Sequence, residues 1–173
     1  MAQWDKIITD SNINDHNTNI VKKDKATTVW LGNTNATGQS LFQDIGDFYG
    51  ETIVYGVGTS FEQGRVYQYG STGWAQANND EPEDGNKLLV VATANTSGNS
   101  LPFSGLLLKG IVRVSPLEGS PVMGQVVYLG QDGKITGTAP TATGSIVRPV
   151  GYCINQYMNI VFFDPDKTWV ELS

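Results

Sequence analysis

Two segments of the chain repeat nearly the same pattern at positions 60 residues apart. Residues 64–73 read GRVYQYGSTG and residues 124–133 read GQVVYLGQDG, so each has a short β-prone run between glycines. Such a run suits a strand, and the glycines after it suit the positive φ angles of a tight turn. A repeat of this kind predicts a β scaffold that uses one unit twice.

The match extends on both sides of these two segments. It pairs Gly50 with Gly110, Val54 with Val114, Ser60 with Ser120, Asn99 with Asn159, Phe103 with Phe163 and, across a one-residue deletion, Gly85 with Gly144 and Val91 with Val150. The pattern predicts two pseudo-repeated β units of about 60 residues, at 50–105 and 106–173. One alternative stays open, because a glycine-rich β protein also repeats its turns without a repeated unit. In that case 50–173 is one continuous β domain.

Strands are predicted over most of the chain after residue 50. They lie at 52–55, 65–69, 74–77, 87–91, 106–114, 125–129, 134–136, 146–150 and 160–163. Their β-branched and aromatic residues, with Gly and Pro between them, predict an all-β fold, either an antiparallel barrel or a sandwich. Pro149 has no N–H for a ladder, so its strand is expected to bend or to lie at an edge. Cys153, the single cysteine, is expected to be a buried strand thiol.

Residues 1–49 differ in character and are predicted to form an extended N-terminal arm, with one connecting strand at 27–31 and at most a helical turn at 40–45. Residues 10–19 are rich in Asn, Asp, Ser and Thr, whose side chains compete for backbone hydrogen bonds. The apolar residues of the arm are too sparse to form a core. We expect the arm to bind a neighbouring chain, or alternatively its own domain, through Trp4, Ile7, Ile8, Ile20, Val21, Lys22, Lys23 and Lys25. The lysines either steer the arm to an acidic neighbour or are simply solvated.

The charge balance narrows the possible partners. The formal net charge is −6, and the 11 Lys and Arg residues are spread along the chain. Nucleic acid is therefore not expected as a partner, because phosphate contacts need clustered basic residues. No segment approaches the roughly 18 apolar residues of a membrane-spanning helix. The first residues also lack a signal-peptide pattern, so we expect a soluble protein made in the cytoplasm.

No pattern predicts a catalytic centre, a cofactor or a metal site. His16, the only histidine, lies in the arm, where a catalytic triad or zinc site has no scaffold. Asp44, Asp47 and Glu51 lie close enough in sequence for a glycosidase carboxylate pair, but a solvated acidic turn explains them as well. Residues 80–85 (DEPEDG) carry oxygen ligands without the alternating spacing of a calcium-binding loop.

The second predicted unit resembles a known family. The resemblance is carried by residues 119–129 (GSPVMGQVVYL), 132–136 (DGKIT), 139–140 (AP) and 146–152 (IVRPVGY). These runs resemble the β domain of small virion structural proteins of tailed bacteriophages, several of which decorate or cement the capsid shell. The resemblance covers 105–163, with a weaker echo at 50–103. Residues 123–126 are additional to the compact form of the family, and the arm has no counterpart in it.

The resemblance implies a non-enzymatic capsid decoration or cement protein. Such a protein is made in the host cytoplasm and resides on the capsid surface of the virion. Its implied partners are the major capsid protein and further copies of itself, as a homotrimer or another symmetric oligomer. Its implied role is capsid stabilisation through the arm and the edge strands.

The aromatic residues carry a second hypothesis. Trp30, Tyr67, Tyr69 and Trp74 would suit a platform for a sugar ring, as in a tail-fibre or head-fibre adhesion module that binds host surface carbohydrate. Aromatic residues in strands also belong to hydrophobic cores, which is the simpler interpretation. A third hypothesis, a glycan-cleaving enzyme, depends on the carboxylates described above.

Overall fold

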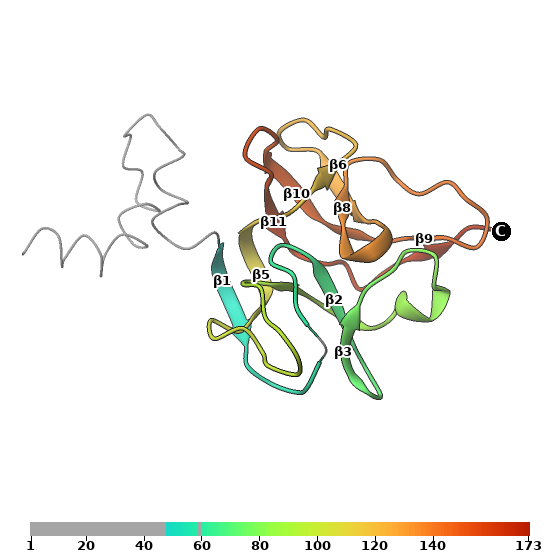
Figure 1. Ribbon diagram of the computed structural model, residues 1–173. Helices are drawn as coiled ribbons and strands as arrows, with labels where there is room; N and C mark the ends of the chain where they lie inside the picture. The colour runs from blue at the N-terminus through green and yellow to red at the C-terminus, as the bar shows by residue number, and fades with distance from the viewer. Residues whose placement is uncertain (1–47, 59) are drawn as a thin grey trace, which may run out of the picture. The chain divides into compact units, whose positions relative to one another are not determined.

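The computed structural model describes residues 48–58 and 60–173. Almost all regular structure in this part of the chain is β, which confirms the predicted fold class (Figure 1). The strands are β1 (Phe48–Ile53), β2 (Val66–Gly70), β3 (Gly73–Gln76), β4 (Leu88–Ala92), β5 (Leu106–Arg113), β6 (Leu117–Glu118), β7 (Val126–Leu129), β8 (Ile135–Thr136), β9 (Ile146–Val147), β10 (Pro149–Asn155), β11 (Ile160–Phe163) and β12 (Val170–Glu171). Two 3₁₀ turns, η2 (Pro82–Asp84) and η3 (Gln131–Gly133), lie in the connections. The predicted arm, with its strand at 27–31 and its helical turn at 40–45, lies outside the described residues.

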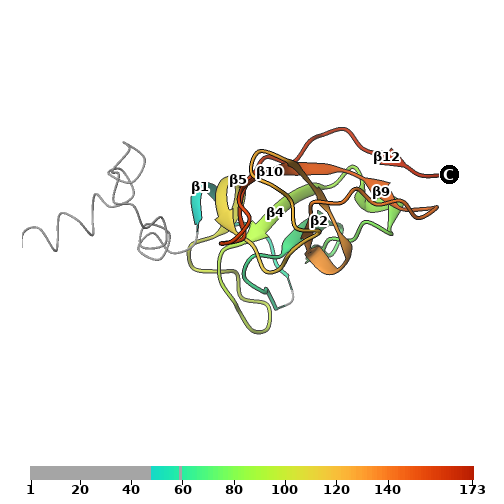
Figure 2. The same ribbon diagram turned by 90° about the horizontal axis from the view of Figure 1, so that it is seen from above.

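Ten of the strands form one sheet in the order β3-β2-β4-β5-β11-β10-β7-β8-β6, with β1 as a further partner of β5. The sheet curls into a half-barrel, which agrees with the predicted barrel or sandwich class, and β9 and β12 pair separately (Figures 1 and 2). Strand β5 has three partners. Strand β4 pairs with its first residues, β11 with its last residues, and β1 along most of its length. Strand β5 therefore joins the two halves of the sheet.

Alternation along the strands separates a core face from an outer face. In β10, Cys153 is fully buried while its neighbours Tyr152 and Ile154 are exposed, which confirms the predicted buried thiol. Burial raises the pKa of this thiol. The main core cluster includes Val66, Leu89, Val91, Leu107, Val112, Val127, Leu129, Ile135, Ile146, Val150, Val161 and Phe163. Each such side chain contributes roughly 1.5–3 kcal/mol by its burial.

Seven of the predicted strands appear within one residue of their expected ends. These are β2, β3, β4, β5, β7, β8 and β11. The first strand instead begins four residues earlier than the predicted Thr52, at Phe48, because its early residues pair with β5. The predicted bend at Pro149 is confirmed. Strand β9 ends just before it, at Val147, and the ladder between β10 and β7 is irregular between Pro149 and Gly151.

Gly64 and Gly124, which the sequence repeat pairs, make similar backbone hydrogen bonds, although the repeat does not pair their acceptors. The N–H of Gly64 donates to the carbonyl oxygen of Ala92 at 2.8 Å, and the N–H of Gly124 donates to that of Cys153 at 2.7 Å. Both bonds fasten the residues just before a hairpin, β2–β3 or β7–β8, to the strand beside it. The division into units 50–105 and 106–173 itself stays a prediction.

The predicted equivalence of Phe103 with Phe163 is wrong. Phe103 is fully exposed in a loop, whereas Phe163 is buried in β11. The alignment of the two repeats shifts at this point because a long loop, 93–105, precedes β5, while a short turn, 156–159, precedes β11. The structural counterpart of Phe103 is Tyr157, since each lies two residues before a residue with positive φ that leads into a strand, Gly105 (φ 81°) or Asn159 (φ 54°).

Candidate functional site

The aromatic platform for sugar does not form from the predicted residues. Tyr67 and Trp74 are only 2% and 3% exposed and belong to a second core cluster, so neither offers a ring face to a ligand. The indole N–H of Trp74 donates to the carbonyl oxygen of Tyr55 at 2.6 Å. Tyr69 packs against Trp74 with ring centroids 4.8 Å apart and is partly exposed. Trp30 lies outside the described residues.

The binding residues predicted in the arm also lie outside the described residues. These are Trp4, Ile7, Ile8, Ile20, Val21, Lys22, Lys23 and Lys25. Of the three candidate carboxylates, Asp44 and Asp47 lie there too, while Glu51 is exposed on β1. The structure therefore brings none of these predicted sites together within its described part.

A first cluster of exposed apolar residues, here named the first tip, lies beside the start of β5. It comprises Val54, Tyr55 and Val57 of the β1–β2 loop and Phe103 of the β4–β5 loop. The two loops meet because Ile53, at the end of β1, pairs with Leu106, at the start of β5. They are in close contact, since a Cβ added at Gly105 would lie 3.1 Å from a Val54 methyl group. Phe103 is 104% exposed, as open to solvent as in an extended peptide. A group of exposed apolar side chains gathered at one place is a candidate contact surface.

A second cluster, here named the second tip, lies beside the other end of β5. It comprises Val122 and Met123 of the β6–β7 loop and Tyr157 of the β10–β11 turn. The β6–β7 loop is fastened to the end of β10 by the bond from Gly124 to Cys153. Tyr157 is 89% exposed, and its N–H donates to the side-chain oxygen of Asn155, which shapes the turn.

The two tips lie at opposite ends of one rigid strand. Leu106, at the start of β5, follows the first tip, and Arg113, at its end, pairs with Ile160 just after the second tip. An antiparallel strand rises about 3.4 Å per residue, so the tips are separated by roughly 24 Å. No sequence pattern predicted these tips. Only the position of Phe103 between Pro102 and the turn residues Ser104 and Gly105 signals an exposed ring.

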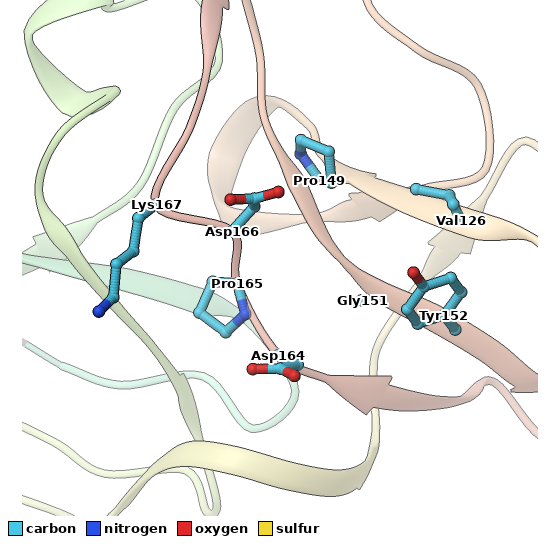
Figure 3. A pocket seen from close by; sticks show the side chains of 8 residues that line it. All are labelled: Val126, Pro149, Gly151, Tyr152, Asp164, Pro165, Asp166 and Lys167. Carbon is cyan, nitrogen blue, oxygen red and sulfur yellow. The ribbon is translucent and has the colours of Figure 1, made fainter.

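An open groove of about 430 Å³ lies between β10 and the segment after β11 (Figure 3). It is lined by Val126, Pro149, Gly151, Tyr152, Asp164, Pro165, Asp166 and Lys167. The Lys109 ammonium forms an ion pair with the Asp164 carboxylate, with 2.8 Å between Nζ and Oδ2. The N–H of Thr168 donates to the Asp166 carboxylate and lowers its pKa. A glycosidase general acid needs a raised pKa, so Asp166 does not fit that role.

In the acidic loop at 80–85, Asp80, Glu81 and Glu83 are exposed, while Gly85 is buried. The loop contains η2, and a Cβ at Gly85 would collide with the ring of Trp169, so the loop lies against that indole. Among the described residues no three His, Cys, Asp or Glu side chains converge as a metal site. In this same part of the chain, no helix has the length and apolar character needed to span a bilayer.

Comparisons with known proteins add no relative. No family model, no curated protein and no solved structure matches the chain. The candidate functional surfaces are the two exposed apolar tips.

Proposed function

We propose that the chain is a non-enzymatic virion structural protein of a tailed bacteriophage, a decoration or cement protein on the capsid surface. Its partners are the major capsid protein and other copies of the chain, arranged as a trimer or another symmetric oligomer. The observation that carries the proposal is the pair of exposed apolar tips at opposite ends of β5. A cement protein must hold two neighbouring subunits at once, and two separated contact points suit that task.

The physical basis is bivalent binding. Each tip has one fully exposed aromatic ring, Phe103 or Tyr157, and aromatic rings are the side chains that most often act as anchors in interfaces. One such anchor supports only a weak contact. When a rigid strand links two anchors, the second contact forms at a high effective concentration, and the overall affinity exceeds that of either tip. Repetition of the subunits on a shell increases this effect further.

Replacing both anchors is expected to weaken binding strongly. We predict that Phe103→Ser with Tyr157→Ser lowers affinity for capsids that lack the protein by about 100-fold, and each single change by about tenfold, because each removes one anchor. Co-sedimentation with such capsids measures this. Val170→Ser is the matched control, since Val170 is also an exposed apolar residue (61%) but belongs to neither tip. Unchanged binding by the double variant would contradict the tip mechanism.

The arm is expected to supply further contacts with neighbouring subunits. We predict that deletion of residues 1–25, which removes Trp4, Ile7 and Ile8, abolishes attachment to capsids but leaves the β unit folded. The β unit at 48–173 has its own core, so its melting temperature should not change. Co-sedimentation and thermal unfolding of the same deletion variant test both parts. Full attachment without the arm would assign binding to the β unit alone.

A further inference from the structure

The groove of Figure 3 has two walls of different chemistry. Tyr152 of β10 and Val126 of β7, which pair across strands, form an apolar wall, and Tyr152 is 50% exposed. Asp164 and Asp166, from the segment after β11, form an acidic wall on the other side of the β10 backbone (Figure 3). Gly151 lies between the two walls and adds no side chain there.

Backbone hydrogen bonds hold the acidic wall in place. The N–H of Asp164 donates to the carbonyl oxygen of Val150 at 3.0 Å, and the N–H of Asp166 donates to that of Pro149 at 3.0 Å. Both acceptors precede the tyrosine of the apolar wall on the same strand, so the two walls are fixed relative to each other. A site that is already formed loses little conformational entropy when a ligand binds.

The two carboxylates are hydrogen-bond acceptors with capacity to spare. Oδ2 of Asp164 lies 2.8 Å from Nζ of Lys109. The N–H of Thr168 donates to Oδ1 of Asp166 at 2.9 Å and lowers the pKa of that carboxyl. An ionised carboxylate has about four lone-pair positions and no donor, so each group can still accept from hydroxyl donors of a ligand. Such charge-assisted bonds are roughly twice as strong as neutral ones.

The charges at the groove disfavour a charged ligand of either sign. Asp164 and Asp166 are accompanied by Lys167 in the lining, by Lys109 in its ion pair and by the buried Arg148, which donates to the carbonyl oxygen of Asp166. Two negative and three positive groups give a net charge of +1, so a cation is not attracted overall. An anion meets the two carboxylates directly at the wall. A neutral ligand with hydroxyl groups avoids both costs.

We infer that the groove binds a neutral sugar ring, which places its C–H face against Tyr152 and donates its hydroxyl groups to Asp164 and Asp166. A pyranose ring has an apolar face and a hydroxyl-bearing edge, and the two walls match these. The groove volume of about 430 Å³ lies within the roughly 300–1,000 Å³ of small-ligand sites. The site uses none of the residues of the predicted aromatic platform. It goes beyond the proposed function, because it requires no contact with a capsid.

An NMR titration of the purified, ¹⁵N-labelled full chain tests the inference. The probes are the methyl glycosides of glucose, galactose, mannose and N-acetylglucosamine, each added up to about 100 mM. Because the groove is open, we expect a dissociation constant of about 1–10 mM for at least one of them. The amide signals of Gly151, Tyr152 and Asp164 should shift and reach saturation.

Variants of each wall show whether the sugar lies between them. Tyr152→Ala removes the aromatic face and should raise the dissociation constant about tenfold. Asp166→Asn keeps the shape of the side chain but removes its charge, and should raise the constant about fivefold. Tyr157→Ala and Asp80→Asn are the matched controls, since both residues are exposed and neither lines the groove, and they should bind the sugar unchanged.

Charged probes separate the sugar from other ligands. Methyl glucuronide and methylguanidinium should each bind at least tenfold more weakly than the sugar that binds best. Tighter binding of methylguanidinium would make the groove a site for a basic side chain of a partner protein and overturn the inference. Saturable shifts from none of the four sugars, or equal loss of binding in the control variants, would also overturn it. No capsid is present, so these outcomes do not bear on the tips, and failure of the tip variants does not bear on the groove.

Discussion

Replacement of Gly110 by alanine is expected to destabilise the folded unit by about 4 kcal/mol. Backbone strain and overpacking both contribute to this loss. Gly110 pairs directly with Gly50 in the antiparallel ladder between β5 and β1, and it has a φ angle of +147° that suits glycine. A Cβ at Gly110 would overlap the carbonyl oxygen of Tyr49 and lie 2.7 Å from the Gly50 Cα. Both obstacles are backbone atoms, so no side-chain rotation relieves the clash.

Urea unfolding followed by tryptophan fluorescence measures this change. For a unit of this size the expected loss corresponds to a fall in melting temperature of about 15 °C. Gly98→Ala is the matched control, because Gly98 also has positive φ (64°) but no atom lies within 4 Å of the added methyl group. The control should lose only about 1 kcal/mol, the cost of the left-handed backbone. Equal losses for the two variants would show that β1 and β5 are not closely packed at this pair of glycines.

Replacement of Arg148 by methionine is expected to destabilise the fold by about 3 kcal/mol. The variant loses two charge-assisted hydrogen bonds, and this loss is partly offset because a charge is no longer buried. Arg148 is only 4% exposed. Its Nε–H donates to the carbonyl oxygen of Asp166 at 2.9 Å and its Nη1–H to that of Lys87 at 2.8 Å. One side chain thus ties the segment after β11 to the start of β4. Burial lowers the pKa of this guanidinium, and the Asp166 carboxylate partly offsets that effect.

Lys134→Met is the matched control for the arginine variant. Lys134 pairs with Glu118 at 2.9 Å, but both side chains are partly exposed, and such surface ion pairs contribute about 0–1 kcal/mol. Thermal unfolding should therefore show a fall of about 10 °C for Arg148→Met and of at most a few degrees for the control. An equally small fall for both would mean that the two carbonyl groups find water when the guanidinium is removed.

The strands were predicted well where one continuous run of β-branched and aromatic residues forms the strand. The two hairpins at 66–76 and 126–136 consist of β-branched and aromatic runs between glycines, so local sequence identifies them. The two-residue strands β6 and β12 were not predictable, because they exist only through their partners β8 and β9. The early start of β1 has the same cause, since pairing with β5 extends it.

The candidate site was harder to predict, because burial depends on three-dimensional neighbours. Tyr67 and Trp74 have the composition of a sugar platform, yet packing against Phe61 and Tyr69 buries them. Phe103 has the composition of a core residue and is instead fully exposed. The sequence also does not show that Tyr49, Ile111 and Phe162 share one face, because they come from three strands and meet only through the sheet register.

Binding of the full chain to purified capsids that lack it tests the central claim, that the chain functions through contacts with shell subunits. We expect saturable co-sedimentation at a fixed ratio to the major capsid protein, together with a higher temperature of capsid disruption. A chain that stays in the supernatant at every concentration, and leaves the disruption temperature unchanged, would contradict the claim.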